Sequence, residues 1–141
     1  MDQFQLLLNS PANLAILVAN IVLSSMAFGN VRLMDRLLFD VGRMRRNKEW
    51  YRGVTSAFIH GDPFHLFMNM LQLYFFGPEV ERLLGTRQFV RFYLFCGAAG
   101  ALTNLIPLAL GRPDVPILGA SGAVLGVLVA FAVIDPDRQL F

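Results

Sequence analysis

Charged residues are scarce in this sequence. Aspartate, glutamate, lysine and arginine make up 16% of the 141 residues, and hydrophobic residues make up 55%, whereas a typical soluble domain is about 25% charged. Three windows, 12–31, 92–110 and 115–134, contain no charged residue and are 19 or 20 residues long. A helix of about 20 apolar residues crosses a bilayer core of about 30 Å. This pattern excludes a soluble globular protein and predicts membrane-spanning helices.

Cysteine is nearly absent as well, and the excess of positive over negative charge is small. The single cysteine, Cys96, excludes an intrachain disulfide and a thiolate metal cluster. The net charge is only +2, and the basic loop lacks the interleaved aromatic residues on which nucleic acid stacks, which argues against nucleic-acid binding. No small-residue cleavage site follows Phe28, and residues 1–11 contain no lysine or arginine. We therefore expect the first apolar run to be retained as an anchor.

Helix start and stop signals divide the chain into spans and connectors. Ser10 and Asp62 are expected N-caps, because each is followed by a proline that suits the first helical position. Gly77 and Pro78 are expected to weaken the second helix, so that the polar segment 79–87 connects it to the third. The sequence thus predicts an all-α polytopic helical bundle in one domain, 1–141, with spans at about 12–28, 63–78, 92–110 and 117–134 and an amphipathic interfacial loop at 30–52.

The fourth span is short. Only Ser121 to Ile134 is firmly predicted as helix, because Pro116 and Gly119 disfavour an earlier start and Asp135 stops the other end. Fourteen residues at about 1.5 Å each reach about 21 Å, roughly 9 Å less than the hydrocarbon core. Irregular backbone at that depth is tolerated only inside protein or beside a water-filled cavity. The sequence therefore predicts a hydrated cavity with Ser121 at its floor.

Ser121 has two interpretations. At a helix N-terminus flanked by Gly119 and Gly122, exposed backbone N–H groups would stabilise an oxyanion. Alternatively, these are small residues for close helix packing, with Gly122 and Gly126 in a GxxxG spacing. The segment is not the G-x-S-x-G nucleophile elbow of soluble hydrolases, because glycine follows the serine directly.

Polar residues around the second span leave similar alternatives. His65 and Asn69 are four apart and share a helix face, so they either donate hydrogen bonds into a cavity or join helices. His60 is expected to lie outside the helix and to pack in the loop. Glu81 either caps or braces a loop or is a solvated charge. We expect no metal and no cofactor, because asparagine is a poor ligand and no cysteine or carboxylate cluster accompanies these residues.

Together these residues resemble the rhomboid family of intramembrane serine proteases. The resemblance covers residues 10–22, the run 50–60 containing Tyr51-Arg52, the spacing of His60, His65 and Asn69, the segment 81–85, and 119–122. It implies four of six expected spans, with the fifth and sixth absent. It also implies that Ser121 is the nucleophile and that the Ser121 N–H, His65 and Asn69 form the oxyanion hole. Its structural motif residues are Arg52, His60, Glu81, Gly85, Gly119 and Gly122.

The resemblance further implies an activity and a location. Family substrates are single-pass membrane proteins whose helices can unwind, and the expected location is the bacterial inner membrane, in a multi-pass arrangement. The family's base is a histidine on the sixth span, whereas this chain contains only His60 and His65. We therefore expect the parent protein to be an endopeptidase and the 141-residue chain to be inactive.

Two alternatives and one conflict remain. The chain could instead be a rhomboid-like protein that binds membrane helices without cutting them, or half of a channel or transporter. The resemblance places the loop 30–52 outside the cytoplasm. That loop holds seven of the twelve basic residues, however, and the positive-inside rule favours the opposite orientation. We expect the orientation that the resemblance implies.

Overall fold

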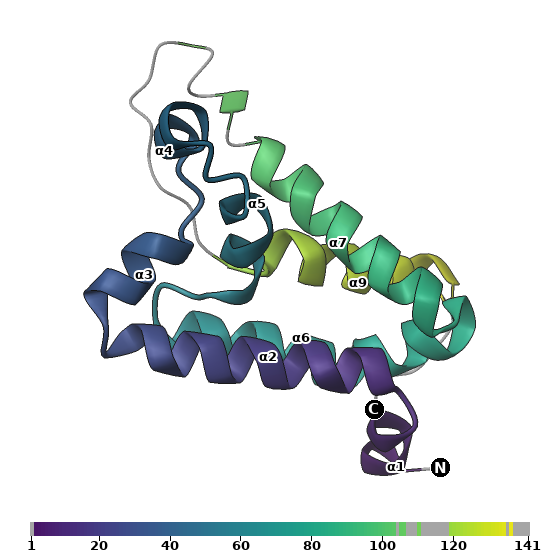
Figure 1. Ribbon diagram of the computed structural model, residues 1–141. Coiled ribbons are helices and arrows are strands. Elements are labelled where there is room, and N and C mark those ends of the chain that lie inside the picture. The colour runs from purple at the N-terminus through teal and green to yellow at the C-terminus, as the bar shows by residue number, and fades with distance from the viewer. Residues whose placement is uncertain (1, 104, 107–109, 111–118, 135, 137–141) are drawn as a thin grey trace.

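The computed structural model of the protein describes residues 2–103, 105–106, 110, 119–134 and 136. The described chain is all-helical, as the sequence predicted (Figure 1). Its elements are α1 (Gln3–Leu8), α2 (Pro11–Phe28), α3 (Val31–Leu37), α4 (Val41–Asn47), α5 (Arg52–Thr55), the 3₁₀ turn η1 (Ser56–Phe58), α6 (Pro63–Leu84), α7 (Thr86–Thr103) and α9 (Ser121–Ile134).

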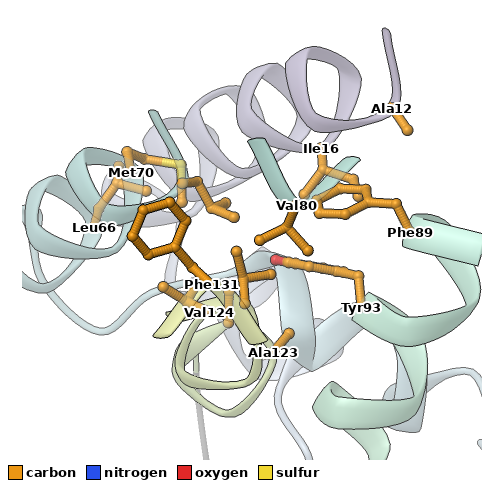
Figure 2. Close-up of a cluster of buried hydrophobic side chains, with 13 residues drawn as sticks. Ala12, Ile16, Leu66, Met70, Val80, Phe89, Tyr93, Ala123, Val124 and Phe131 are labelled. Atoms are coloured by element: carbon orange, nitrogen blue, oxygen red, sulfur yellow. The ribbon is translucent and has the colours of Figure 1, made fainter. Parts of the chain in front are cut away.

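Four long helices form the bundle. Helices α2 and α6 lie side by side, and α9 packs against both α6 and α7 (Figure 1). Because the start of α2 contacts the end of α6, these two helices run antiparallel. Figure 2 shows the core where the four meet, with Phe131 and Val124 of α9 facing Met70 of α6 and with Tyr93 of α7 close by. This packing fixes the start of α9 relative to α6.

Helix α2 has the bounds that its local signals predicted. It begins at Pro11 and ends before Gly29. Ser10 is the N-cap residue, as predicted, but its side chain makes no capping hydrogen bond. The Ser10 hydroxyl donates instead to the carbonyl of Leu6, 2.9 Å away. The free N–H groups at the start of α2 are satisfied by another helix, as described below.

Helix α6 is longer than predicted. It continues through Gly77 and Pro78 and ends only at Leu84, so the expected connector 79–87 is helical over most of its length. A proline in a helix removes the N–H that would bind the carbonyl four residues earlier. Here that carbonyl belongs to Tyr74, and the side-chain amide of Gln3 donates to it at 2.6 Å. The replacement hydrogen bond explains why Pro78 does not end the helix.

Helix α7 also begins earlier than predicted, at Thr86 rather than at Phe92. Gly85, with φ of 79°, is the break between α6 and α7. Helix α9 covers Ser121–Ile134, the bounds that the sequence predicted. Parts of the predicted third and fourth spans, including Ile117, lie outside the described residues, as do Pro116 and Asp135.

One described helix, α2, is long and apolar enough to cross a membrane by length and composition. Helix α9 is apolar but has only 14 residues. Helix α6 carries Glu79, Glu81 and Arg82 in its last two turns, and α7 carries Arg87 and Arg91 in its first two. The number of four spans therefore stays a prediction.

The segment 30–52 folds into two short helices. The side chains of Asn30 and Asp40 cap α3 and α4, each by accepting a backbone N–H hydrogen bond. Neither helix has a fully buried residue. Arg52 anchors the end of the segment and is 1% exposed. Its guanidinium donates to the carbonyls of Asp35 and Leu38 at 2.7 and 3.0 Å, and it pairs with Glu49 at 2.5 Å.

Candidate active site

Ser121 is the first residue of α9, and its side chain is exposed. It lines a cavity of about 980 Å³ between α7 and α9, together with Ser56, Ala57, Gly119 and Gly122. Most of the remaining lining consists of small or apolar residues of the two helices. Because the N–H groups in the first turn of a helix lack intrahelical partners, they are available to bind developing negative charge beside Ser121.

Gly119 forms the turn that leads into α9. Its φ is 112°, a conformation that residues with a side chain rarely adopt, and its N–H donates to the carbonyl of Ser56 at 3.1 Å. A Cβ at this position would lie 2.8 Å from Cε1 of His65. The turn therefore requires glycine for two independent reasons. It also brings the His65 ring next to the backbone two residues before Ser121.

The packing role of the other glycines is real as well. A Cβ on Gly122 would lie 3.0 Å from Cα of Gly100, and a Cβ on Gly126 would lie 2.5 Å from Sγ of Cys96. Helices α7 and α9 thus cross at a distance that only glycine permits. The two interpretations of this segment are compatible, because Gly119 faces His65 whereas Gly122 and Gly126 face α7.

His65 and Asn69 occupy the first two turns of α6. The predicted cap is present, since the Asp62 carboxylate accepts the His65 N–H at 2.8 Å and Pro63 is the first helical residue. His65 is partly buried against Gly119. Asn69 is 5% exposed, and its Nδ2 has no hydrogen-bond partner among the described residues. An unsatisfied buried donor is expensive, so Nδ2 is available for an acceptor that the described chain does not supply.

His60 lies outside the helices and is fully buried, as its predicted loop position implied. Its Nδ1 is 3.0 Å from Oγ of Ser24 on α2, and its ring lies edge-on to that of His65, with centroids 5.1 Å apart. Burial, together with a smaller contribution from His65, lowers the pKa of His60 to about 4, and Asp62 opposes the shift. The imidazole is therefore neutral at ordinary pH.

Glu81 is 3% exposed, which excludes the alternative of a solvated charge. Its two carboxylate oxygens accept the backbone N–H groups of Ala12 and Asn13 at 3.1 and 2.7 Å. Thr86 donates its hydroxyl to the same carboxylate at 2.9 Å. Glu81 therefore caps α2 from a neighbouring helix, where its negative charge also complements the helix dipole.

Sequence reasoning missed three polar residues of α2. Asn13, Asn20 and Ser24 are all fully buried. Asn13 donates to the carbonyl of Leu73 at 3.1 Å, and Asn20 donates to the carbonyl of Ile16 at 2.8 Å. The sequence did contain a signal for these residues, because spacings of seven and four residues place all three on one face of a helix that has no charged residue. Burying polar residues in such a helix costs free energy, so their presence indicates a structural or functional role.

The fold and the site together define a helical bundle that presents a serine at the start of a short apolar helix, beside a glycine turn packed on a histidine. Residues 47–140, more than half of the chain, match the family model of the rhomboid domain. The chain therefore belongs to the rhomboid family, as its motifs suggested. Members of this family are integral membrane proteins, and the family includes proteases.

The chain is similar to relatives from eukaryotes and bacteria. Rhomboid protein 1, mitochondrial, from Saccharomyces cerevisiae is 39% identical over 89 residues, which cover 62% of this chain and 26% of the yeast protein. Presenilin-associated rhomboid-like protein, mitochondrial, from Rattus norvegicus is 38% identical over 91 residues, covering 62% and 23%. Rhomboid protease GluP from Bacillus subtilis is 34% identical over 94 residues, covering 66% and 18%. The matched part of the chain thus spans about a quarter or less of these relatives.

Proposed function

We propose that this chain is the nucleophile-bearing portion of an intramembrane serine endopeptidase, with four of six spans, in the bacterial inner membrane. Its substrates are transmembrane segments of single-pass membrane proteins. The observation that carries the proposal is the position of Ser121, exposed on a cavity of about 980 Å³ at the N-terminus of α9, directly after the turn that contacts His65. In this proposal the cavity holds water and an unwound peptide segment below the membrane surface.

In this mechanism, the Ser121 hydroxyl attacks the scissile carbonyl. The resulting oxyanion is bound by the Ser121 N–H, by an imidazole N–H of His65 and by Nδ2 of Asn69. The unpartnered state of Asn69 Nδ2 supports this role, because a donor held without an acceptor is ready to stabilise charge that develops only in the transition state. Loss of one such donor typically lowers the rate about 10²- to 10³-fold.

The chain itself contains no suitable base. A serine hydroxyl is a weak nucleophile without one, and the two histidines are His60, engaged by Ser24, and His65, which packs on Gly119. By resemblance, the base is a histidine on a sixth span. We therefore expect the 141 residues alone to cleave no substrate, and a polypeptide that supplies the fifth and sixth spans to restore cleavage.

The test is to co-express such a polypeptide with the chain and to follow cleavage of a single-pass reporter. Ser121→Ala should abolish the product. Ser56→Ala is the matched control, because Ser56 lines the same cavity and contributes only its backbone carbonyl to the Gly119 turn. Cleavage that survives Ser121→Ala would overturn the assignment.

A second candidate is a rhomboid-like protein that binds membrane helices without cutting them. The mostly small and apolar lining of the cavity on α7 and α9, which suits a bound helix, favours this function. Photo-crosslinking from Leu125 or Val129 of α9, which are exposed and line the cavity, would detect a bound helix. Crosslinking without cleavage, in the presence of the added spans, would put this function first.

A further inference from the structure

Three side chains from separate parts of the chain form a buried row that ends at the candidate active site. Ser24 comes from the last turn but one of α2, His60 from the connection between η1 and α6, and His65 from the first turn of α6. Ser24 and His60 are both fully buried. They lie behind His65, on elements that contribute nothing else to the candidate site.

The contacts of Ser24 link the direction of its hydroxyl hydrogen bond to the tautomer of His60. The Ser24 hydroxyl lies 3.3 Å from the carbonyl oxygen of Phe58 and 3.0 Å from Nδ1 of His60. A hydroxyl has one proton to donate, and a carbonyl can only accept. If Ser24 donates to Phe58, then His60 must donate from Nδ1 to the Ser24 oxygen. The neutral imidazole is left with an unprotonated Nε2.

Nε2 of His60 is buried and has no hydrogen-bond partner among the described residues. The rings of His60 and His65 meet at 82°, with centroids 5.1 Å apart. The imidazole of His65 lies between this ring and the Gly119 backbone, where no room remains for even a Cβ. The His60 ring and the Gly119 backbone restrict the rotamers of His65. A fixed His60 ring leaves the His65 side chain fewer rotamers than a mobile ring would.

We propose that Ser24 and His60 are positioning residues, which hold the His65 imidazole against Gly119 in the orientation needed for oxyanion binding. The catalytic part of this statement rests on the proposed protease function, whereas the structural part does not. Ser24 fixes the His60 ring through Nδ1, and the His60 ring fixes that of His65. Neither Ser24 nor His60 contacts the substrate.

The first test reads the histidines directly. ¹⁵N spectra of the 141-residue chain, with labelled histidine in detergent micelles, should show His60 protonated at Nδ1 and not at Nε2. The opposite tautomer would overturn the proposal without any variant being made. Ser24→Ala should change the ring signals of His65, although Ser24 lies beyond His60. Ser24→Thr keeps the hydroxyl and should return those signals to their wild-type positions.

Ser25→Ala is the matched control, because Ser25 is the next residue of α2 and is exposed. It should leave both histidines unchanged. Unchanged His65 signals in folded Ser24→Ala would overturn the proposal. If Ser24→Ala fails to fold, the tautomer and the Ser24→Thr spectrum still decide, since a threonine hydroxyl that leaves His60 protonated at Nε2 also contradicts it.

The second test uses the reconstituted cleavage assay. Ser24→Ala should lower kcat on the order of 10-fold with little change in KM, because a misplaced oxyanion donor weakens transition-state binding more than substrate binding. Ser24→Thr should restore kcat, and Ser25→Ala should leave it unchanged. A Ser24→Ala enzyme with disturbed His65 signals and wild-type kcat would refute the catalytic part. Absence of cleavage in every variant, wild type included, would instead count against the protease function.

Discussion

The carboxylate of Glu81 and the backbone N–H of Asn13 lie 2.7 Å apart, although 68 residues separate them in the sequence. Through this contact the last turn of α6 caps the first turn of α2. The same carboxylate accepts the Ala12 N–H and the Thr86 hydroxyl, so a single buried side chain joins three helices. The contact fixes the antiparallel register of α2 and α6, and hence the position of His65 at the opposite end of α6.

Glu81→Gln should destabilise the bundle by about 1–3 kcal/mol, because the amide keeps one acceptor and replaces the other with a donor facing a backbone N–H. Thermal or denaturant unfolding in detergent measures the loss. Asp2→Asn is the control, since Asp2 also accepts a backbone N–H at a helix start, that of Gln5 at 2.8 Å, but is exposed. An equal loss in both variants would contradict the role of burial at Glu81.

Gly77→Ala should cost about 1–3 kcal/mol through overpacking, because a Cβ there would collide with the side-chain amide of Asn13. Gly29→Ala is the matched control, since a Cβ on Gly29 meets nothing within 4 Å and its φ is −92°. Unfolding of Gly77→Ala, of Asn13→Ala and of the double variant Gly77→Ala/Asn13→Ala gives, with the wild type, a double-mutant cycle. A cycle without coupling between positions 13 and 77 would show that the collision is relieved elsewhere.

Local sequence signals predicted the helices whose ends depend on local chemistry. Pro11 and Gly29 bound α2, and Ser121 and Ile134 bound α9, because proline, glycine and the neighbouring acidic residue act within one turn. The continuation of α6 through Pro78 could not be predicted in this way. It depends on a hydrogen bond from Gln3, 71 residues away.

The features of the candidate site also separate into those set by local sequence and those set by tertiary contacts. The spacing of His65 and Asn69 and the glycine two residues before Ser121 are local patterns, which can be read in the sequence alone. The buried cap at Glu81 and the contact between Ser24 and His60 are tertiary. A serine in an apolar helix has several ordinary explanations, so only its neighbours distinguish them.

Gly119→Ala should disturb the site more than the bundle. The substitution combines a φ of 112° with a Cβ 2.8 Å from the His65 ring, so the turn must shift and the imidazole must move. We expect altered ¹⁵N signals of His65 and, in the reconstituted enzyme, a loss of kcat on the order of 10²-fold. Gly97→Ala is the control, because its Cβ would make only ordinary contacts at 3.6 and 3.7 Å with Ala123 and Ala57. Wild-type His65 signals in folded Gly119→Ala would rule out the predicted contact.

The stability of the bundle should fall as the pH drops below the ordinary pKa of histidine. Burial lowers the pKa of His60 from 6.5 to about 4 in the folded protein, so between these values the unfolded chain binds a proton that the folded chain does not. The free energy of unfolding then decreases with falling pH by up to about 1.4 kcal/mol per pH unit. Above pH 6.5 His60 is neutral in both states and this loss is absent. Unfolding measured from pH 7.5 to pH 4.5 should show this slope.

Carboxylates also begin to titrate near the lower end of that range, so the informative quantity is the difference between variants. His60→Gln should flatten the slope, whatever its effect on absolute stability, because the glutamine does not titrate. His65→Gln should retain most of it, since burial is the largest cause of the His60 shift and His65 contributes less. Parallel pH profiles for the wild type and His60→Gln would mean that His60 gains its proton without unfolding, which a fully buried imidazole between Ser24 and His65 should not do.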